Sequence, residues 1–181
     1  MSRTSVFLQS YPQAELRGGP ILALQQAIGA TADPYFARAG LENVAPDEWY
    51  SMAQYLQVVY EIFEHEPDVM QNMISIGMRM AEHLVLPPEI DSLEKGLIAM
   101  EVSWRTNTRN TPPAIWSVKK LTATSFICTC SSPMPIDQEY GTVYGFVRKF
   151  ARGQACNVAY ENLADRDDPD KEEVLFRVTI G

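Results

Sequence analysis

The sequence predicts an α+β fold, in which an N-terminal helical half packs on a small antiparallel sheet with one inserted helix. Apolar residues recur at helical spacing up to about residue 110, and the period changes to two after Thr111-Pro112-Pro113. The 181 residues suffice for one ordinary domain. We therefore expect a single domain over residues 1–181, with a helical part at about 1–110 and a mixed β/α part at about 114–181.

The helical half is expected to contain a short helix over 21–28 and longer helices over 46–63, 67–86 and 91–104. The 46–63 segment shows the evidence best, because its apolar residues recur every three or four positions, at Trp49, Met52, Leu56, Val59 and Phe63. Pro46 suits a first helical turn, and Pro87-Pro88 ends the next helix. Asp91 and Glu94 stand in the register of a capping box.

The second half alternates apolar and polar residues over 116–118 and 126–130, which predicts an antiparallel strand pair. Asp137 is expected to cap a helix that runs to Phe150 and ends at Gly153. Alternation returns at 156–160 and 174–180, where two further strands are expected.

The composition excludes several classes of function. Lys and Arg number 15 against 23 Asp and Glu, a net charge of -8, which argues against nucleic acid or an anionic membrane surface as a partner. No apolar run approaches the roughly 20 residues that span a bilayer. The three cysteines do not form a disulfide framework. We expect a cytoplasmic protein without a membrane span.

Motifs for catalysis are missing from the sequence. It contains no Gly-x-x-x-x-Gly-Lys, Gly-x-Gly-x-x-Gly, Gly-x-Ser-x-Gly or His-Glu-x-x-His pattern. No catalytic residue can be named, and the sequence favours a protein that is not an enzyme.

One histidine is a candidate ligand for a metal or a haem. His83 falls on the inner stripe of its predicted helix, one turn from Met80, whereas His65 lies at a joint between helices. A neutral imidazole at His83 could bind haem iron, or it could be a core histidine bonded to a carbonyl. No other histidine stands at the spacing of a His-x-x-x-His zinc site.

The cysteines allow two interpretations. Cys128 and Cys130 are two apart on a predicted strand and face the same side, so with Cys156 and His83 they could hold a soft metal ion. They could equally be buried thiols that pack as small apolar groups. We expect both strand thiols to be reduced, with no disulfide between them.

A ligand pocket is predicted between the second long helix and the sheet. Helical spacing turns Met73, Met80 and His83 inward, and strand alternation turns Phe126, Cys128 and Cys130 to one side. Trp104 and Phe146 are expected as further walls. Such a lining suits a flat conjugated ligand, although the same residues could interlock as core.

Two segments resemble a known group of domains. Residues 130–137 (CSSPMPID) and 140–150 (YGTVYGFVRKF) resemble the Cys- and Pro-containing turn and Gly-punctuated helix of 4-vinyl-reductase-type domains. That wider group includes haem–nitric-oxide-binding domains and small subunits of the transport-particle tethering complex. The resemblance implies an α+β ligand-binding fold around an apolar pocket, often dimeric, with haem or another tetrapyrrole as a candidate ligand. The Tyr-x-Ser-x-Arg signature of the haem–nitric-oxide sensors is absent.

Two functions from different classes follow. The first is a non-catalytic sensor or carrier domain that binds a flat hydrophobic small molecule, with a tetrapyrrole as one candidate. The second is a scaffold or adaptor whose pocket is filled by side chains and whose surface binds a protein partner. In either case the wide apolar stripes predict a homodimer joined through an amphipathic helix.

Overall fold

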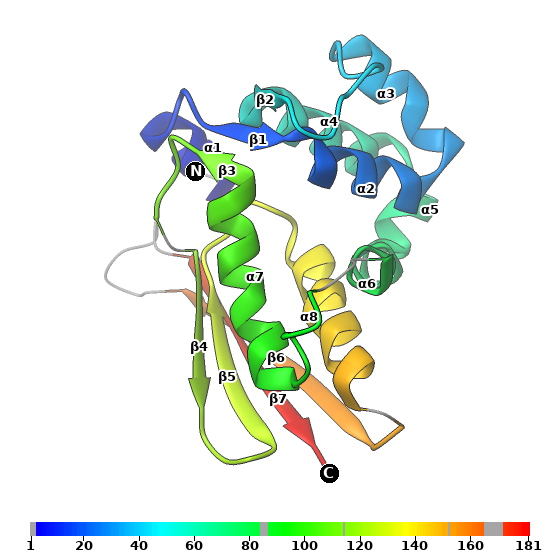
Figure 1. Ribbon diagram of the computed structural model, residues 1–181. Helices are drawn as coiled ribbons and strands as arrows, with labels where there is room; N and C mark the ends of the chain where they lie inside the picture. Colours follow the sequence, from blue (N-terminus) through cyan, green and yellow to red (C-terminus); the bar gives the residue numbers. More distant parts are fainter. Residues whose placement is uncertain (1–2, 84–86, 114, 152, 165–171) are drawn as a thin grey trace.

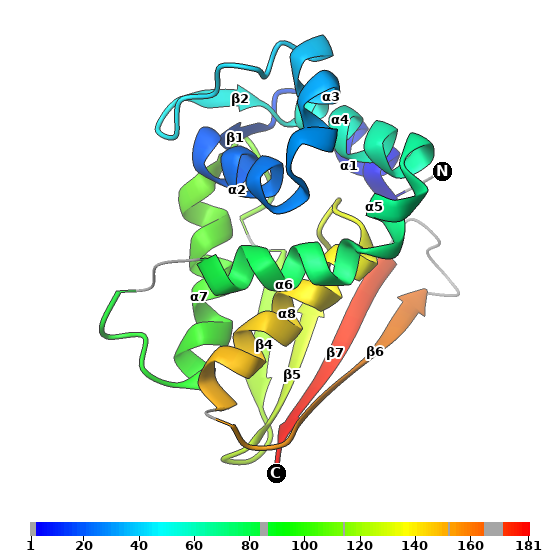
Figure 2. The same cartoon turned by 90° about the vertical axis from the view of Figure 1, so that its right-hand side faces the viewer.

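A computed structural model describes residues 3–83, 87–113, 115–151, 153–164 and 172–181. It confirms the α+β class, because helices dominate the first part of the chain and an antiparallel sheet the second. Figures 1 and 2 show helices α1 to α5 gathered at one end of the molecule, with the larger sheet and helices α6 to α8 below them. The buried side chains accordingly form two apolar cores, one in each part.

The first core lies among the helices of the N-terminal part. These are α1 (Arg3–Ser10), α2 (Gly18–Ile28), the 3-10 turn η1 (Ala30–Ala32), α3 (Asp33–Arg38), α4 (Met52–His65) and α5 (Pro67–Gln71). Their largest fully buried side chains include Phe36, Tyr55 and Ile62. The stripe predicted for the long helix therefore faces this core, as helical periodicity requires.

The start of that helix differs from the prediction. Helix α4 begins at Met52 instead of Pro46, and Trp49–Ser51 form strand β2, paired with β1 (Glu15–Arg17). The indole of Trp49 lies between the guanidinium groups of Arg17 and Arg109, 5.4 and 4.5 Å from its ring centre. This pairing holds the segment extended, and the Ser51 hydroxyl then accepts a capping bond from the Gln54 amide at 3.4 Å.

The helix predicted over 67–86 is divided. Helix α5 ends at Gln71 and α6 runs over Met73–His83. The amide of Asn72 donates from its side chain to the Asp68 carbonyl at 2.6 Å, which competes with continuous helical bonding at the joint. The predicted last residues, 84–86, lie outside the described part of the chain.

The second core lies between the larger sheet and its helices. The elements are α7 (Leu93–Asn107), β3 (Thr108–Arg109), β4 (Trp116–Lys120), β5 (Ser125–Cys130), α8 (Ile136–Ala151), β6 (Cys156–Ala164) and β7 (Glu172–Ile180). All pairings in the sheet are antiparallel, in the order β4-β5-β7-β6, while β3 joins the small sheet β2-β1-β3. Helix α7 is capped by Ser92 and not by the predicted Asp91.

Helices α6 and α8 cross at unusually close range, as Figure 2 shows. A Cβ placed on Gly77 would lie 2.2 Å from the Gln138 carbonyl oxygen, and one on Gly141 would lie 2.1 Å from the Ile74 carbonyl oxygen. Only glycine permits this approach, so the crossing fixes the position of α8 against α6. No helix in the described ranges combines the length and apolarity needed to cross a bilayer.

Candidate functional site

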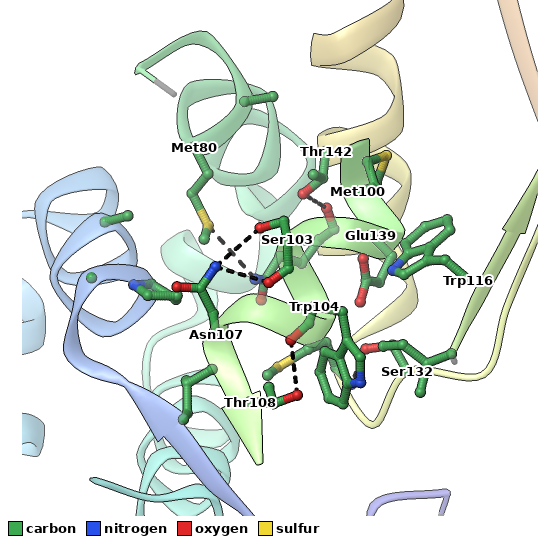
Figure 3. Close-up of a pocket in the computed structure, with 18 of the residues that line it drawn as sticks. Met80, Met100, Ser103, Trp104, Asn107, Thr108, Trp116, Ser132, Glu139 and Thr142 are labelled. Atoms are coloured by element: carbon green, nitrogen blue, oxygen red, sulfur yellow. Dashed lines mark hydrogen bonds between the residues drawn. The ribbon is translucent and has the colours of Figure 1, made fainter. Parts of the chain in front are cut away.

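A cavity of about 430 Å³ lies where the two cores meet. Its lining comes from β1, α2, α4, α6, α7, α8, the first residue of β3, the start of β4 and the turn before α8 (Figure 3). The residues are Leu16, Gly19, Pro20, Ala23, Tyr55, Met80, Ala81, Met100, Ser103, Trp104, Asn107, Thr108, Ile115, Trp116, Ser132, Met134, Gln138, Glu139, Thr142 and Phe146. The volume falls in the range of small-molecule pockets.

The cavity exists because neither core fills the space between them. Leu16 and Tyr55 belong to the first core, and Met100 and Phe146 to the second. Trp104 packs against both cores. A void between two separately packed layers is where proteins commonly accommodate ligands.

Aromatic and thioether side chains form the walls. Trp116 stacks on Phe176 of β7, with ring centres 5.8 Å apart and an interplanar angle of 24°. Trp104 donates its indole N–H to the Pro112 carbonyl at 3.3 Å, which fixes the orientation of its ring. Met80 and Met100 add polarizable, adaptable surface. These walls suit a flat conjugated molecule.

Several polar side chains of the lining donate to backbone carbonyls of the helix that contains or precedes them. Asn107 donates its amide to the Ser103 carbonyl at 2.8 Å, and Thr108 its hydroxyl to the Trp104 carbonyl at 2.9 Å. The Thr142 hydroxyl donates to the Gln138 carbonyl at 2.9 Å. Figure 3 shows these bonds as dashed lines beside the cavity. Their donors are therefore engaged within the protein, while their oxygen atoms can still accept a hydrogen bond.

Three buried polar side chains on α4 and α8 are the exception. Tyr55 is 1% exposed, Gln138 5% and Glu139 9%. Burial, together with the nearby carboxyl of Glu139, raises the pKa of Tyr55 well above its usual value, while the amide of Gln138 lowers it. Tyr55 therefore stays a neutral phenol at physiological pH.

The structure brings together part of the predicted site. Met80, Trp104 and Phe146 line the cavity, whereas Met73, Phe126, Cys128 and Cys130 do not. Each of these last four is at most 2% exposed and belongs to one of the cores. The inward residues of β5 therefore do not face the cavity, because they pack with side chains of α7, α8 and β7 in the second core. The side chain of His83, the last residue of α6, lies outside the described residues.

The predicted metal ligands are not gathered at one point. Cys156 of β6 pairs with Ile180 of β7, and Cys128 of β5 pairs with Phe176 of β7. Strand β7 therefore lies between the two strands that carry these cysteines. Burial raises the pKa of the Cys128 thiol to about 12, so it is a neutral thiol at physiological pH. Within the described segments, no group of three or more His, Cys, Asp and Glu residues could hold a metal ion. All three cysteines are free, as expected for the strand pair.

Sequence reasoning missed Tyr55, Gln138 and Glu139. Tyr55 follows Met52 at helical spacing and could have been assigned to the inner stripe of its helix. Gln138 and Glu139 stand next to Asp137 in a polar segment, where they read as a solvated first turn. They are buried because α6 crosses directly over this turn, a long-range contact without a local signal.

No model of a protein family matches this chain, and no curated protein matches it either. Its fold is that of H-NOX domains. An oxygen-binding H-NOX domain related to soluble guanylate cyclases, solved as its oxygen complex, is 14% identical with a TM-score of 0.61, covering 90% of this chain and 94% of that one. A structure from work on H-NOX activation is also 14% identical, with a TM-score of 0.61 over 90% and 93% of the two chains. A third, from work on porphyrin distortion and haem redox potential, is 11% identical with a TM-score of 0.62 over 91% and 99%.

The described lining does not fit a haem of the kind that these neighbours imply. It contains no histidine or cysteine to bind the iron, and no lysine or arginine to pair with a carboxylate of the ligand. Its one carboxyl side chain, Glu139, is an acid and supplies no positive charge to pair with those carboxylates. The comparisons therefore support the fold expected from the haem–nitric-oxide-binding resemblance, and the 4-vinyl-reductase part of that resemblance stays a prediction.

Proposed function

We propose that this protein is a non-catalytic sensor or carrier domain that encloses a flat, largely apolar small molecule between its two cores. The observation that carries this proposal is the cavity of about 430 Å³, whose lining includes two tryptophans and three methionines. A protein that needs only a packed scaffold would lose stability by leaving such a void. The similarity in fold to ligand-binding H-NOX domains supports the same function.

A neutral fluorescent dye provides the test. Nile red is flat, uncharged and brighter in apolar surroundings, and we expect it to bind with a stoichiometry of one per chain. Ser103→Phe places a ring in the cavity from α7 and should weaken dye binding by at least roughly tenfold, since it fills the space that the dye needs. Thr106→Phe is the matched control, because Thr106 is exposed on the same helix.

The two variants separate the sensor from the adaptor. Equal dye binding by Ser103→Phe and the unchanged protein would contradict binding in this cavity. Absence of any dye binding would favour the alternative predicted from the sequence, a scaffold or adaptor that binds a protein partner.

A tetrapyrrole belongs to the proposed class of flat conjugated ligands, and the haem-related structures among the neighbours support it as one candidate. The visible absorption spectrum of the purified protein tests it directly, because a bound tetrapyrrole gives a Soret band. The lining contains tryptophan rings that could contact the faces of such a ligand, and it contains no histidine among the described residues. We therefore expect contact through the faces of the ligand and not an iron–imidazole bond to a described residue.

A further inference from the structure

The side chain of Gln138 carries the clearest indication of what the cavity accepts. Its Oε1 atom is buried and has no hydrogen-bond partner among the described residues. A buried amide oxygen without a partner is costly, and in native proteins such a group calls for an explanation. Gln138 is one of the residues that line the cavity, so its side chain lies beside the space that a ligand would occupy.

Gln138 cannot easily turn away to find another partner. Its backbone carbonyl accepts from Thr142 at 2.9 Å and lies against Gly77 of α6, where no side chain would fit. Its Nε2 atom donates to the Sδ atom of Met80 at 3.7 Å. The helix crossing thus fixes the backbone at Gln138, while its side-chain amide has a partner for Nε2 and none for Oε1.

The charges of the lining restrict the ligand further. Glu139 adjoins Gln138, and no described lining residue carries a positive charge. An anionic ligand would enter a low-dielectric space without a cation to pair with it and close to a carboxyl group. A neutral ligand avoids that cost.

From these observations, and resting on the proposed function, we infer that the cavity selects uncharged flat molecules with an N–H or O–H donor at their edge, which bonds to Gln138 Oε1. The indole rings of Trp104 and Trp116 would contact the faces of such a molecule. A dianionic porphyrin falls outside this class.

Four indole probes test the inference on the unchanged protein by titration calorimetry. Indole should bind roughly tenfold more tightly than 1-methylindole, which has the same ring but no N–H donor for Gln138. Indole-3-acetamide should bind at least roughly tenfold more tightly than indole-3-acetate, which is nearly the same shape but charged. Because these comparisons need no variant, they do not depend on whether a mutant folds.

Two variants then assign the effects to residues. Gln138→Met keeps the length of the side chain and removes the acceptor, so the preference for indole over 1-methylindole should fall to about onefold. Glu139→Gln should reduce the discrimination against indole-3-acetate. Gln57→Met, at an exposed position of α4, is the matched control and should keep both preferences.

The outcomes distinguish the inference from the proposed function. If indole and 1-methylindole bind equally, and the acetate binds as well as the acetamide, the cavity binds ligands but the inference about Gln138 and charge is wrong. If none of the four probes binds at millimolar concentration while Nile red binds in the cavity, the inference is wrong and the proposed function stands. If Nile red does not bind either, both are contradicted.

Discussion

Two methionines on the same helix should respond very differently to truncation. Met73 is 1% exposed in the first core, whereas Met80, two turns further along α6, is half-buried and lines the cavity. Changing either residue to alanine removes the same three heavy atoms and gives the same gain in helix propensity. The difference between the two variants therefore reports the surroundings of each side chain.

The size of the difference follows from these surroundings. For Met73, three methylene-sized groups give a transfer loss of roughly 2.4 kcal/mol. A new void in a packed core raises the total to about 3–4 kcal/mol. For Met80, truncation enlarges a space that already exists, so we expect a loss of about 1 kcal/mol.

Urea unfolding followed by circular dichroism measures both losses, and thermal unfolding checks them. A chain of this size loses about 2–4 °C in Tm per kcal/mol, so Met73→Ala should melt roughly 6–16 °C lower and Met80→Ala roughly 2–4 °C lower. Equal losses of 3 kcal/mol or more for the two variants would show that Met80 is as tightly packed as Met73. The presence of a cavity between the two cores would then be refuted.

Three further predictions concern the helix crossing, a buried thiol and assembly. Gly141→Ala should lower the free energy of unfolding by about 3 kcal/mol, because its Cβ would lie 2.1 Å from the Ile74 carbonyl oxygen; Gly19→Ala, with its nearest contact at 3.7 Å, is the control and should change stability by less than about 1 kcal/mol. The raised pKa of Cys128, about 12 when folded, means that the unfolded chain loses its thiol proton first as pH rises. Between about pH 9 and 12, the free energy of unfolding should fall more steeply in the unchanged protein than in Cys128→Val, by up to about 1.4 kcal/mol per pH unit. Parallel pH profiles of the two proteins would refute this. The homodimer remains a prediction, for which light scattering should give about twice the 20.3 kDa chain mass, and a monomer at micromolar concentration would refute it.

The sequence allowed the fold class to be predicted because periodicity is a local property. The change of period after Pro113 located the start of the larger sheet, and β4 and β5 begin within a residue of the predicted strands. The three-residue strands β1 and β2 escaped notice, because segments so short carry no measurable alternation. Their pairing depends instead on Trp49 lying between two arginines from distant parts of the chain.

The position of the cavity could not be predicted for a related reason. Periodicity indicates which side of each element faces inward, and it correctly turned Met80, Trp104 and Phe146 toward the interior. It does not indicate which inward faces meet and which leave a space. Here Cys128 packs within the second core, whereas a cavity remains between the two cores, lined in part by the crossing helices α6 and α8.

A crystal structure of the protein with Nile red bound tests the central claim most directly. The account predicts electron density for one flat dye in the cavity between the two cores, in contact with Trp104 and Trp116. Density for the dye only at the outer surface, with side chains closing the space between the cores, would contradict it.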